Sequence, residues 1–505
     1  MSLYTRVRNK LFPNNRALEC ERYLKKNPVQ IKVLLAGLMQ SANLGDGIIS
    51  DCVSYLIKKA AKESGIKKVT VATRDIRKQR KTADLNVVRN SDILMIPGGG
   101  MIKYQVENLP VAMNRFLSRA EHYGIPAVFN AVGVEGYDGE NADCRLLCEM
   151  LANYSVKGIT CRDYSDFLNE KYLVGNMKAT RVSDPAVWAG EVYGVSRDEN
   201  SEVVGLGVAR EGLFEDYGID LDKEALLKLW SSVINELERR GKKWRLFTNG
   251  LGKDEEFLDE LVKYIGAQDQ DVRVPAASTP EELVNTISGF SLVIAERMHA
   301  CIVAYALNIP CVGLVWNDKI TCFGQGIGCE ERFITPDKFD GAYITDVAMK
   351  ALEDGYDMTV YQQQKDSAFE SVRDLFVPLA VCLRDARSCD LSKRKVVCYG
   401  LPNLESEKLN KEFFSTQVDY FVSDDTSLVN GECLGKKICP AHKLLNKFRK
   451  KPFVIISEMV DYTPVAKMLM QNGYKERFDF TNMHSYKRYP FRKGDVFIDA
   501  PPAQK

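Results

Sequence analysis

The chain has 505 residues and a nearly balanced charge, with 69 lysines and arginines against 68 aspartates and glutamates. A net charge of +1 excludes the large basic surface that is typical of nucleic-acid-binding proteins. The hydrophobic fraction of 45% is ordinary for a globular protein, and at about 150 residues per domain the length predicts about three domains.

Residues 1–30 are predicted to form a basic helical segment, because apolar residues lie among arginines and lysines. The segment lacks the apolar core of a secretion signal, and no run of about 18 uncharged apolar residues occurs in the chain. We therefore expect a cytoplasmic protein. Two interpretations of the segment stay open: peripheral contact with an anionic membrane surface, or a helix packed on the body of the protein.

Residues 31–200 are predicted to form a first α/β domain. Helical patterns separate apolar strands with the sequences IKVLLAG, KKVTVAT, DILMIP, PAVFNAVG and GITC. This alternation is typical of a parallel sheet covered by helices on both faces. Two strand ends are suited to a ligand: an Asn-x-Gly-Asp turn follows the first strand, and three glycines, at 98–100, follow DILMIP.

Residues 201–390 are predicted to form a second α/β domain, because the same alternation restarts. Its expected strands have the sequences VVGLGVA, WRLFTNG, VRVPA, LVIA and CVGLVW. Residues 340–390 are predicted to be helical and either close this domain or return to the first one. Two such halves are expected to face each other across a cleft.

Residues 391–505 are predicted to form a small Rossmann-like third domain. Its first turn, YGLPNLESEK, keeps only Gly400 of the G-x-G-x-x-G pattern, and Pro402 and Leu404 would obstruct a pyrophosphate. Asp424 and Asp425 end the second strand, where an acid that binds ribose would stand. Nucleotide binding and an assembly or interaction role both remain open for this domain.

The strand LVIA in the second domain is followed at once by Arg297 and His299, in the turn that leads into a helix. In an open parallel sheet such turns line the ligand crevice, and the first N–H groups of the helix add partial positive charge. The turn is therefore predicted to bind a phosphate or a carboxylate.

Several motifs, taken in chain order, resemble the polysaccharide pyruvyl transferases over residues 31–328. The resemblance is most specific where an Arg-x-His turn, an alanine-rich helix and an x-x-Pro turn follow one another. Two departures are Met298, where the family carries leucine, and Asn308, where glycine is more usual. The matching residues are Asn43, Gly45, Asp46, Gly98, Gly99, Gly100, Arg162, Asp163, Asp184, Pro185, Arg210, Arg297, His299, Pro310, Lys319, Phe323 and Gly328.

The resemblance implies two Rossmann-like halves in a glycosyltransferase-B-type arrangement, with the acceptor on the first half and the donor on the second. It also implies transfer of a pyruvyl group from phosphoenolpyruvate to a sugar diol, as a cyclic ketal, with release of phosphate. Such a transferase would act in polysaccharide, exopolysaccharide or glycolipid biosynthesis on a saccharide or lipid-linked saccharide. No cofactor is expected, and no metal, because no carboxylate or histidine cluster has ligand spacing.

The predicted catalytic residues are Arg297, Arg210 and His299. The two arginines would hold the donor, although pairing with Glu296 or Glu211 is an alternative. His299 would act as general acid or general base, and the sequence does not decide which.

The predicted substrate-binding residues are Asn43, Gly45, Asp46, Gly99, Gly100, Met298 and Lys319. Capping of a helix by Asp46 is the simpler alternative to a contact with acceptor hydroxyls. A structural ion pair near the hinge is an equal alternative for Arg162, Asp163 and Asp184. Two other functions stay open for the chain: a nucleotide-sugar-dependent glycosyltransferase of the same architecture, or a non-catalytic assembly factor.

Overall fold

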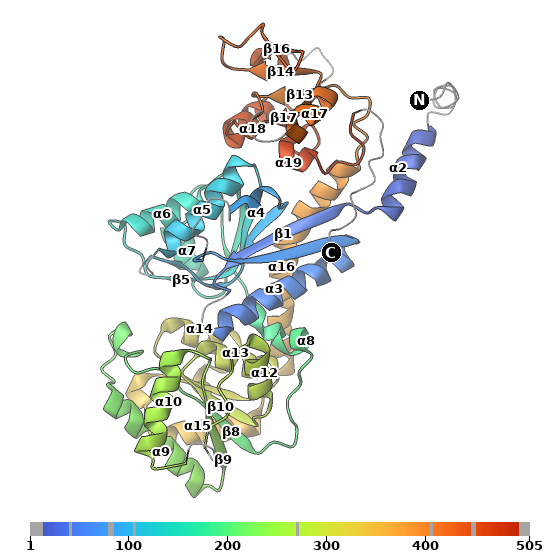
Figure 1. Cartoon of the computed structure of the whole chain (residues 1–505). Helices are drawn as coiled ribbons and strands as arrows, with labels where there is room; N and C mark the ends of the chain where they lie inside the picture. The colour runs from blue at the N-terminus through green and yellow to red at the C-terminus, as the bar shows by residue number, and fades with distance from the viewer. Residues whose placement is uncertain are drawn as a thin grey trace.

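The structure is a computed structural model that describes residues 14–39, 43–78, 85–104, 108–268, 272–403, 408–445 and 451–493. Three largely parallel sheets form three units, and the first half lies between the second half and the C-terminal unit (Figure 1). The predicted fold class, two Rossmann-like halves in a glycosyltransferase-B-type arrangement with a third small α/β unit, is confirmed.

The first half is built on a sheet with the order β2-β1-β3-β5-β6-β7, and β4 also pairs with β5. The chain adds strands first on one side of β1 and then on the other, which opens a crevice at the carboxyl ends of β1 and β3. The strands are β1 (Gln30–Gly37), β2 (Lys68–Asp75), β3 (Ile93–Ile96), β4 (Gly99–Lys103), β5 (Ala127–Glu135), β6 (Val156–Cys161) and β7 (Thr180–Arg181). The helices are α3 (Leu44–Glu63), α4 (Asn86–Arg89), α5 (Leu109–His122), α6 (Ala142–Leu151), α7 (Ser165–Lys171), η2 (Pro185–Trp188) and α8 (Ala189–Tyr193).

The second half repeats this topology with the order β12-β11-β10-β8-β9, so its crevice lies at the carboxyl ends of β8 and β10. The strands are β8 (Val203–Gly207), β9 (Lys243–Phe247), β10 (Leu292–Ala295), β11 (Cys311–Leu314) and β12 (Phe333–Ile334). The helices are α9 (Lys223–Arg239), α10 (Gly252–Tyr264), α12 (Pro280–Ser288), α13 (Met298–Ala306), α14 (Asp318–Gly326) and α15 (Gly341–Asp354), with short turns η3 (Glu215–Tyr217), η4 (Glu330–Arg332) and η5 (Pro336–Lys338).

One predicted strand of the second half is wrong. The segment VRVPA forms only an isolated bridge between Arg273 and Leu246. Pro275 lacks a backbone N–H group and cannot donate to a strand ladder, which explains why the pairing does not extend.

The helices predicted after the second half are confirmed, and the second of them returns to the first half. Helix α16 (Met358–Ser388) has 31 residues and packs against α3, η2 and β5. It runs from the second half past the first to the C-terminal unit (Figure 1). Near its end Arg387 forms a buried ion pair with Asp92 of the first half and donates to Ser485 of the C-terminal unit at 3.2 Å.

The C-terminal unit contains a sheet with the order β15-β16-β14-β13-β17-β18, in which only the β15–β16 pairing is antiparallel. It packs on the first half, where Asn482 Nδ2 donates to Tyr123 O at 2.7 Å. The strands are β13 (Val396–Tyr399), β14 (Tyr420–Ser423), β15 (Glu432–Cys433), β16 (Lys436–Pro440), β17 (Phe453–Ile456) and β18 (Phe480–Asn482). The helices are α17 (Lys408–Gln417), η6 (Ala441–Leu445), α18 (Tyr462–Gln471) and α19 (Met483–Tyr486).

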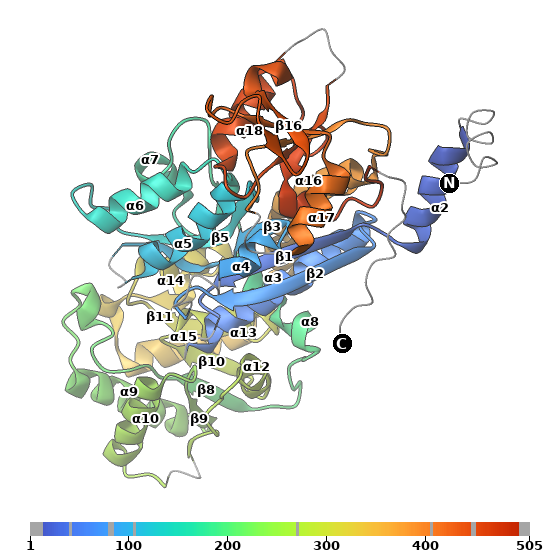
Figure 2. The same cartoon turned by 45° about the horizontal axis from the view of Figure 1, so that its top comes forward.

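The N-terminal segment is helical where the structure describes it, in α2 (Asn14–Lys26), while residues 1–13 lie outside the described part. This helix lies at the edge of the molecule beside the amino end of β1 (Figures 1 and 2). Arg16 pairs with Asp390 at 3.2 Å, and the rings of Tyr23 and Phe491 are 5.7 Å apart, so the helix contacts the body. No helix in the described part of the chain has the length and apolar character needed to cross a membrane.

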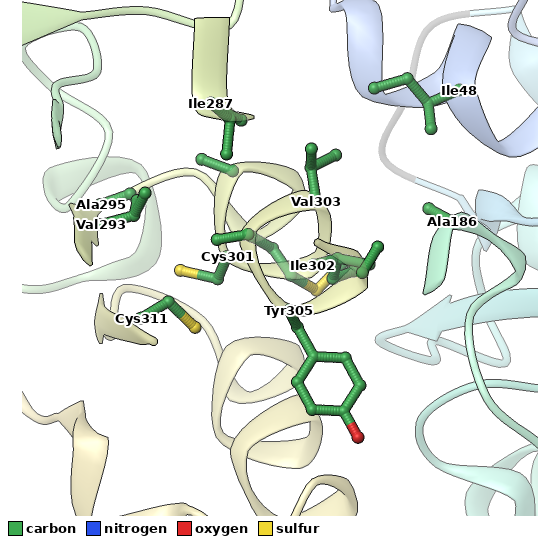
Figure 3. Close-up of a cluster of buried hydrophobic side chains, with 14 of the residues drawn as sticks. Ile48, Ala186, Ile287, Val293, Ala295, Cys301, Ile302, Val303, Tyr305 and Cys311 are labelled. Carbon is green, nitrogen blue, oxygen red and sulfur yellow. The ribbon is translucent and has the colours of Figure 1, made fainter. Parts of the chain in front are cut away.

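The two halves share one hydrophobic core around α13. Figure 3 shows Ile302 and Val303 of this helix facing Ile48 of α3 and Ala186 of η2, which belong to the first half. The opposite side of α13 packs on strands of its own sheet. The shared core fixes α3 and α13 against each other, and the amino ends of both helices lie where the crevices meet.

Candidate active site

The two crevices face each other around the amino end of α3. The N–H group of Leu44 donates to the carbonyl of Asn249 at 3.4 Å, across the junction of the halves. A Cβ atom on Gly47 would lie 2.8 Å from Pro280 of the second half. Because of these close contacts, residues that follow β1 and β10 form a single site.

His299, in the first turn of α13, packs against Gly45 in the first turn of α3. A Cβ atom on Gly45 would overlap the imidazole ring, so the contact requires glycine. The imidazole is buried, and its Nε2 has no hydrogen-bond partner among the described residues. Burial lowers the pKa of His299 to about 4, and nearby cations add to the effect. The ring is therefore neutral at pH 7.

A buried ion pair between Arg162 and Asp184 lies beside this histidine. Arg162 Nη1 donates to Asp184 Oδ2, and the same oxygen lies 4.0 Å from His299 Nε2. The other carboxylate oxygen accepts the N–H group of Ala186 at 2.9 Å and so caps η2. The structural ion pair that the sequence left open is thus present. Its carboxylate is placed to stabilise a protonated His299.

Asp163 plays a different part from its neighbour Arg162. Its Oδ1 accepts the N–H groups of Val134 at 3.0 Å and of Tyr164 at 2.8 Å. These bonds tie the end of β6 to the end of β5. Asp163 therefore holds the backbone at the ends of β5 and β6, which border the site.

A second charged cluster joins the halves around Glu135, at the end of β5. Its Oε1 lies 2.6 Å from Lys103 Nζ and accepts the hydroxyl of Tyr217 at 2.8 Å. Its Oε2 lies 3.4 Å from Nζ of Lys319, which the second half contributes. Burial opposes ionisation of Glu135, but these two lysines lower its pKa overall. Burial also lowers the pKa of Lys319, although Glu135 opposes that shift.

The structure assigns partners to the two arginines that were predicted to hold the donor. Arg297 binds the buried carboxylate of Asp254 through Nε at 3.0 Å and Nη2 at 2.6 Å. Arg210 pairs with Asp216 and donates to the Glu211 carbonyl at 3.0 Å. Arg297 pairs with Asp254, and the alternative partner considered for it, Glu296, is bound elsewhere.

Glu296 is buried next to this turn and holds it in place. Its carboxyl accepts Trp230 Nε1 at 2.5 Å and the N–H group of Ala209 at 3.0 Å. Burial raises the pKa of Glu296 to about 8, so it is largely protonated at pH 7. It therefore connects the ends of β8 and β10 without adding a full charge to the site.

Asn43, and not Asp46, is the residue that caps α3. Asn43 Oδ1 accepts the N–H group of Gly45 at 3.4 Å, and Asp46 lies inside the first turn of the helix. The alternative that Asp46 caps α3 is therefore wrong, because Asn43 occupies the capping position. Gly99 has a φ of +94°, and a Cβ atom there would lie 3.3 Å from Asp46 Oδ1. A Cβ atom on Gly100 would meet open space.

A cavity of about 250 Å³ lies next to these groups. Both halves contribute to its walls, and His299 lies behind Asp184 rather than in the wall itself. Arg210 lines a different cavity, of about 560 Å³, on the second half. Residues that line the central cavity include Arg162, Arg181, Asp184, Met298, Lys319 and Phe323.

The structure thus brings together most of the predicted site residues and adds three that the sequence analysis missed. Gly45, Met298, His299 and Lys319 surround the meeting point of the halves. Glu135 carried a usable signal, because it is a charged residue at the end of a buried strand. The missed residues are Lys103, Glu135 and Tyr217.

The chain was compared with known proteins. The family model of the polysaccharide pyruvyl transferases matches residues 43–318, which is more than half of the chain. No curated protein sequence matches it. Similar solved structures include a UDP-GlcNAc 2-epimerase from Neisseria meningitidis bound to UDP-GlcNAc, with 11% identity, a TM-score of 0.45, and coverage of 70% of this chain and 100% of the other. Another is the UDP-GlcNAc 2-epimerase from Methanocaldococcus jannaschii, with 12% identity, a TM-score of 0.46, and coverage of 69% and 99%.

The motifs found in the sequence and the family match cover the same part of the chain, from the cap of α3 to the start of α14. Gly45, Met298 and His299, at the meeting point of the halves, lie in this region, and Lys319 follows it directly. The chain belongs to the polysaccharide pyruvyl transferase family.

Proposed function

We propose that the protein transfers the pyruvyl group of phosphoenolpyruvate to two hydroxyl groups of one sugar, forming a cyclic ketal and releasing phosphate, in polysaccharide or glycolipid synthesis. One observation carries the proposal. His299, neutral at pH 7 and with an unpartnered Nε2, lies among cations between the halves of a chain of this family. A neutral imidazole accepts a proton, and cations hold an anionic donor.

Lys319 is the cation best suited to bind the donor phosphate. Its ammonium group lines the cavity and is 3.4 Å from its nearest carboxylate oxygen, on Glu135, so it can turn to a ligand. Arg181 lines the same cavity and donates to the Cys322 carbonyl at 2.8 Å, which leaves other N–H groups for the donor carboxylate. Lysine and arginine together would neutralise the donor.

Arg297 and Arg210 take different parts in this proposal. The Arg297–Asp254 pair is buried, and breaking such a pair costs about 3–5 kcal/mol, so Arg297 stays in place and acts through its charge. Arg210 pairs with the exposed Asp216, and exposed pairs contribute about 0–1 kcal/mol. An anionic ligand could therefore displace Asp216, although Arg210 lies outside the central cavity.

The reaction can be written with one proton carrier. His299 takes the proton of the first sugar hydroxyl, and Asp184 stabilises the imidazolium. As His299 gives this proton to the donor methylene, which becomes the methyl group, the sugar oxygen bonds to the positive charge that develops at C2. The second hydroxyl bonds to C2 as the C2–O bond to phosphate breaks, and its proton leaves with phosphate. His299 is neutral again, and neither a metal nor an oxidant takes part.

The acceptor is proposed to bind on the first half, where Asn43, Asp46, Gly99 and Gly100 border the crevice. The carboxylate of Asp46 can accept sugar hydroxyls, and the glycine turn leaves room for a ring to approach the backbone. The Nε2 of His299 is buried, and Gly45 packs on the Cγ–Nδ1 side of the ring, so residues around the ring have to move for both substrates to reach Nε2.

The proposal is tested first by calorimetry with phosphoenolpyruvate, which needs no acceptor. The donor is expected to bind the wild type, and Lys319→Gln is expected to weaken binding by on the order of tenfold. Lys228→Gln, on the exposed face of α9, is the matched control and is expected to bind as the wild type does. His299→Gln is expected to keep the binding and to lose phosphate release in an acceptor screen followed by ³¹P NMR.

Two outcomes would contradict the proposal. One is protection of the protein by a nucleotide sugar with none by phosphoenolpyruvate. The other is unchanged phosphate release by His299→Gln, because the proton transfer would then run through another group.

A further inference from the structure

The C-terminal unit contains a cavity lined mainly by basic residues. The cavity measures about 760 Å³, roughly three times the volume of the one between the halves. It lies at the amino ends of β13, β14 and β17, beside the β15–β16 hairpin and η6. Figure 1 places β14 and β16 at the end of the molecule opposite the second half, far from the catalytic cleft.

Six lysines line this cavity, against one carboxylate. The carboxylate, Asp419, is already paired with Lys493 and accepts the N–H group of Val396 at 2.9 Å. Arg394 also lines the cavity but is bound to Asp479 at 2.6 Å. The six lysines are Lys393, Lys395, Lys436, Lys437, Lys443 and Lys451.

These lysines lack acidic partners in the part of the chain that the structure describes. Lys451 donates to the Gly473 carbonyl at 2.6 Å, and Lys443 lies 3.3 Å from Cys439 Sγ, so both are held by neutral atoms. The other four make no ion pair there. A chain with a net charge of only +1 therefore concentrates unopposed positive charge on one cavity, where the ammonium groups repel one another.

The carboxyl end of the same sheet, where Rossmann-like units bind nucleotides, is closed by the chain itself. A Cβ atom on Gly400 would overlap Val460 and lie 3.4 Å from Ser457. Asp424, at the position expected for a ribose-binding acid, accepts the hydroxyl of Tyr399 instead. The basic cavity at the opposite end is thus the open site of this unit.

We propose that this cavity binds a ligand that carries two or more phosphates, such as a diphosphate group. Six lysines around one cavity match a multiply charged anion better than they match a single carboxylate, because lysine binds phosphate as a point charge. The cavity is also larger than a single phosphate needs. The diphosphate could belong to a soluble molecule or to a lipid headgroup, and the test separates these sources. The proposal does not depend on the reaction proposed for the cleft.

The test uses the full-length protein with the double variant Lys436→Gln/Lys437→Gln, both on the β15–β16 hairpin. The control is Lys67→Gln/Lys68→Gln, an exposed adjacent pair at the start of β2 in the first half. Inorganic pyrophosphate is titrated by calorimetry at low salt, with inorganic phosphate as a second probe. Because the catalytic cleft also holds cations, the readout is the difference between the two variants.

Pyrophosphate is expected to bind the wild type more tightly than phosphate does, and on the order of tenfold more weakly to the hairpin variant than to the control. In a second arm, co-sedimentation is measured with phosphatidylcholine vesicles that contain or lack diacylglycerol pyrophosphate, whose headgroup is a diphosphate. Binding to the acidic vesicles that the hairpin variant loses identifies a lipid source, and pyrophosphate binding without vesicle binding identifies a soluble one. Absence of both, or equal losses in the two variants, overturns the proposal.

Discussion

The cleft between the halves and the junction with the C-terminal unit contain the same kinds of residues, but the two regions use their polar atoms differently. At the junction, His122 lies 2.9 Å from Asp461 through Nδ1 and 3.0 Å from the Glu458 carbonyl through Nε2. In the cleft, Nε2 of His299 has no partner among the described residues. A buried polar atom without a partner costs about 1–3 kcal/mol, so His299 is maintained at a cost that His122 avoids.

The buried ion pairs of the two regions differ in the same way. At the junction, Asp92 accepts from Arg387, from Arg488 at 2.6 Å and from the N–H group of Lys32 at 2.9 Å. Burial opposes its ionisation, but the two arginines lower its pKa overall. In the cleft, Asp184 faces Arg162 on one side and a titratable histidine on the other. The partners of Asp92 are thus arginines and a backbone N–H group, which keep their protons near pH 7, whereas Asp184 also lies beside a histidine that can exchange a proton.

The largest expected effect comes from His299→Gln, which tests the reactive side of this comparison. Loss of the proton carrier is expected to lower turnover by about 10²–10⁴-fold, while the unfolding free energy at pH 7 changes by less than about 1 kcal/mol. Phosphate release and urea unfolding measure the two quantities. His122→Gln is the matched control, expected to keep turnover and lose about 1 kcal/mol of stability. Equal losses of turnover in both variants would break the comparison.

The substitution Asp92→Asn tests whether the junction with the C-terminal unit depends on its buried ion pair. It leaves the buried Arg387 and the half-buried Arg488 without their carboxylate, so we expect the unfolding free energy to fall by about 3–5 kcal/mol. Turnover per folded molecule is expected to stay unchanged. Urea unfolding checks the first statement, with Asp374→Asn as the control because its pair with Arg373 is exposed. A loss below about 1 kcal/mol would mean that the junction does not depend on this pair.

The pH dependence of stability sharpens the comparison further. The pKa of His299 is about 4 in the folded protein, against an ordinary value of 6.5, so only the unfolded chain takes up this proton between those values. The wild type is therefore expected to lose up to about 3 kcal/mol relative to His299→Gln as the pH falls from 6.5 to 4. Glu296, with a pKa of about 8, makes both proteins more stable as the pH falls. Because this contribution is the same in the wild type and in His299→Gln, it cancels when their unfolding free energies are subtracted. Parallel stability curves would show that His299 titrates normally.

Gly45→Ala is expected to have the smallest effect, because it moves the imidazole without removing it. The new methyl group would overlap the His299 ring, and a shift of about 1 Å in a catalytic group lowers turnover by about 10²-fold. Gly252→Ala is the control, since it lies at the start of α10 and its Cβ would meet open space. Steady-state assays that find wild-type turnover in Gly45→Ala would show that the contact does not position the ring.

The sequence predicted those parts of the molecule that local patterns determine. Alternating strands and helices gave the two halves, and the arginine and histidine after LVIA were placed in the turn that leads to α13. The segment VRVPA misled the analysis because its apolar residues resemble a strand while Pro275 limits the pairing. The sequence left open whether Asp46 caps α3, because two residues near the start of the helix can do so, and only the backbone geometry shows that Asn43 does.

The partners of the site residues come from elements far apart in the chain, which no local pattern encodes. Asp254 lies 43 positions from Arg297 within the second half, and Tyr217 lies 82 positions from Glu135 across the halves, yet each pair forms hydrogen bonds. Pairing at such separations depends on how the helices and strands pack in three dimensions. For this reason the sequence identified Arg297 and His299, but it did not show which charged residues lie beside them.

Helix α16 limits the ways in which the molecule can move. With 31 residues at about 1.5 Å each, it forms a rod about 46 Å long that lies along the first half and reaches the C-terminal unit. The Arg387–Asp92 pair joins this helix to the first half, and Arg387 also donates to Ser485 of the C-terminal unit at 3.2 Å. A ligand held in the basic cavity would therefore keep its place relative to the acceptor crevice proposed on the first half.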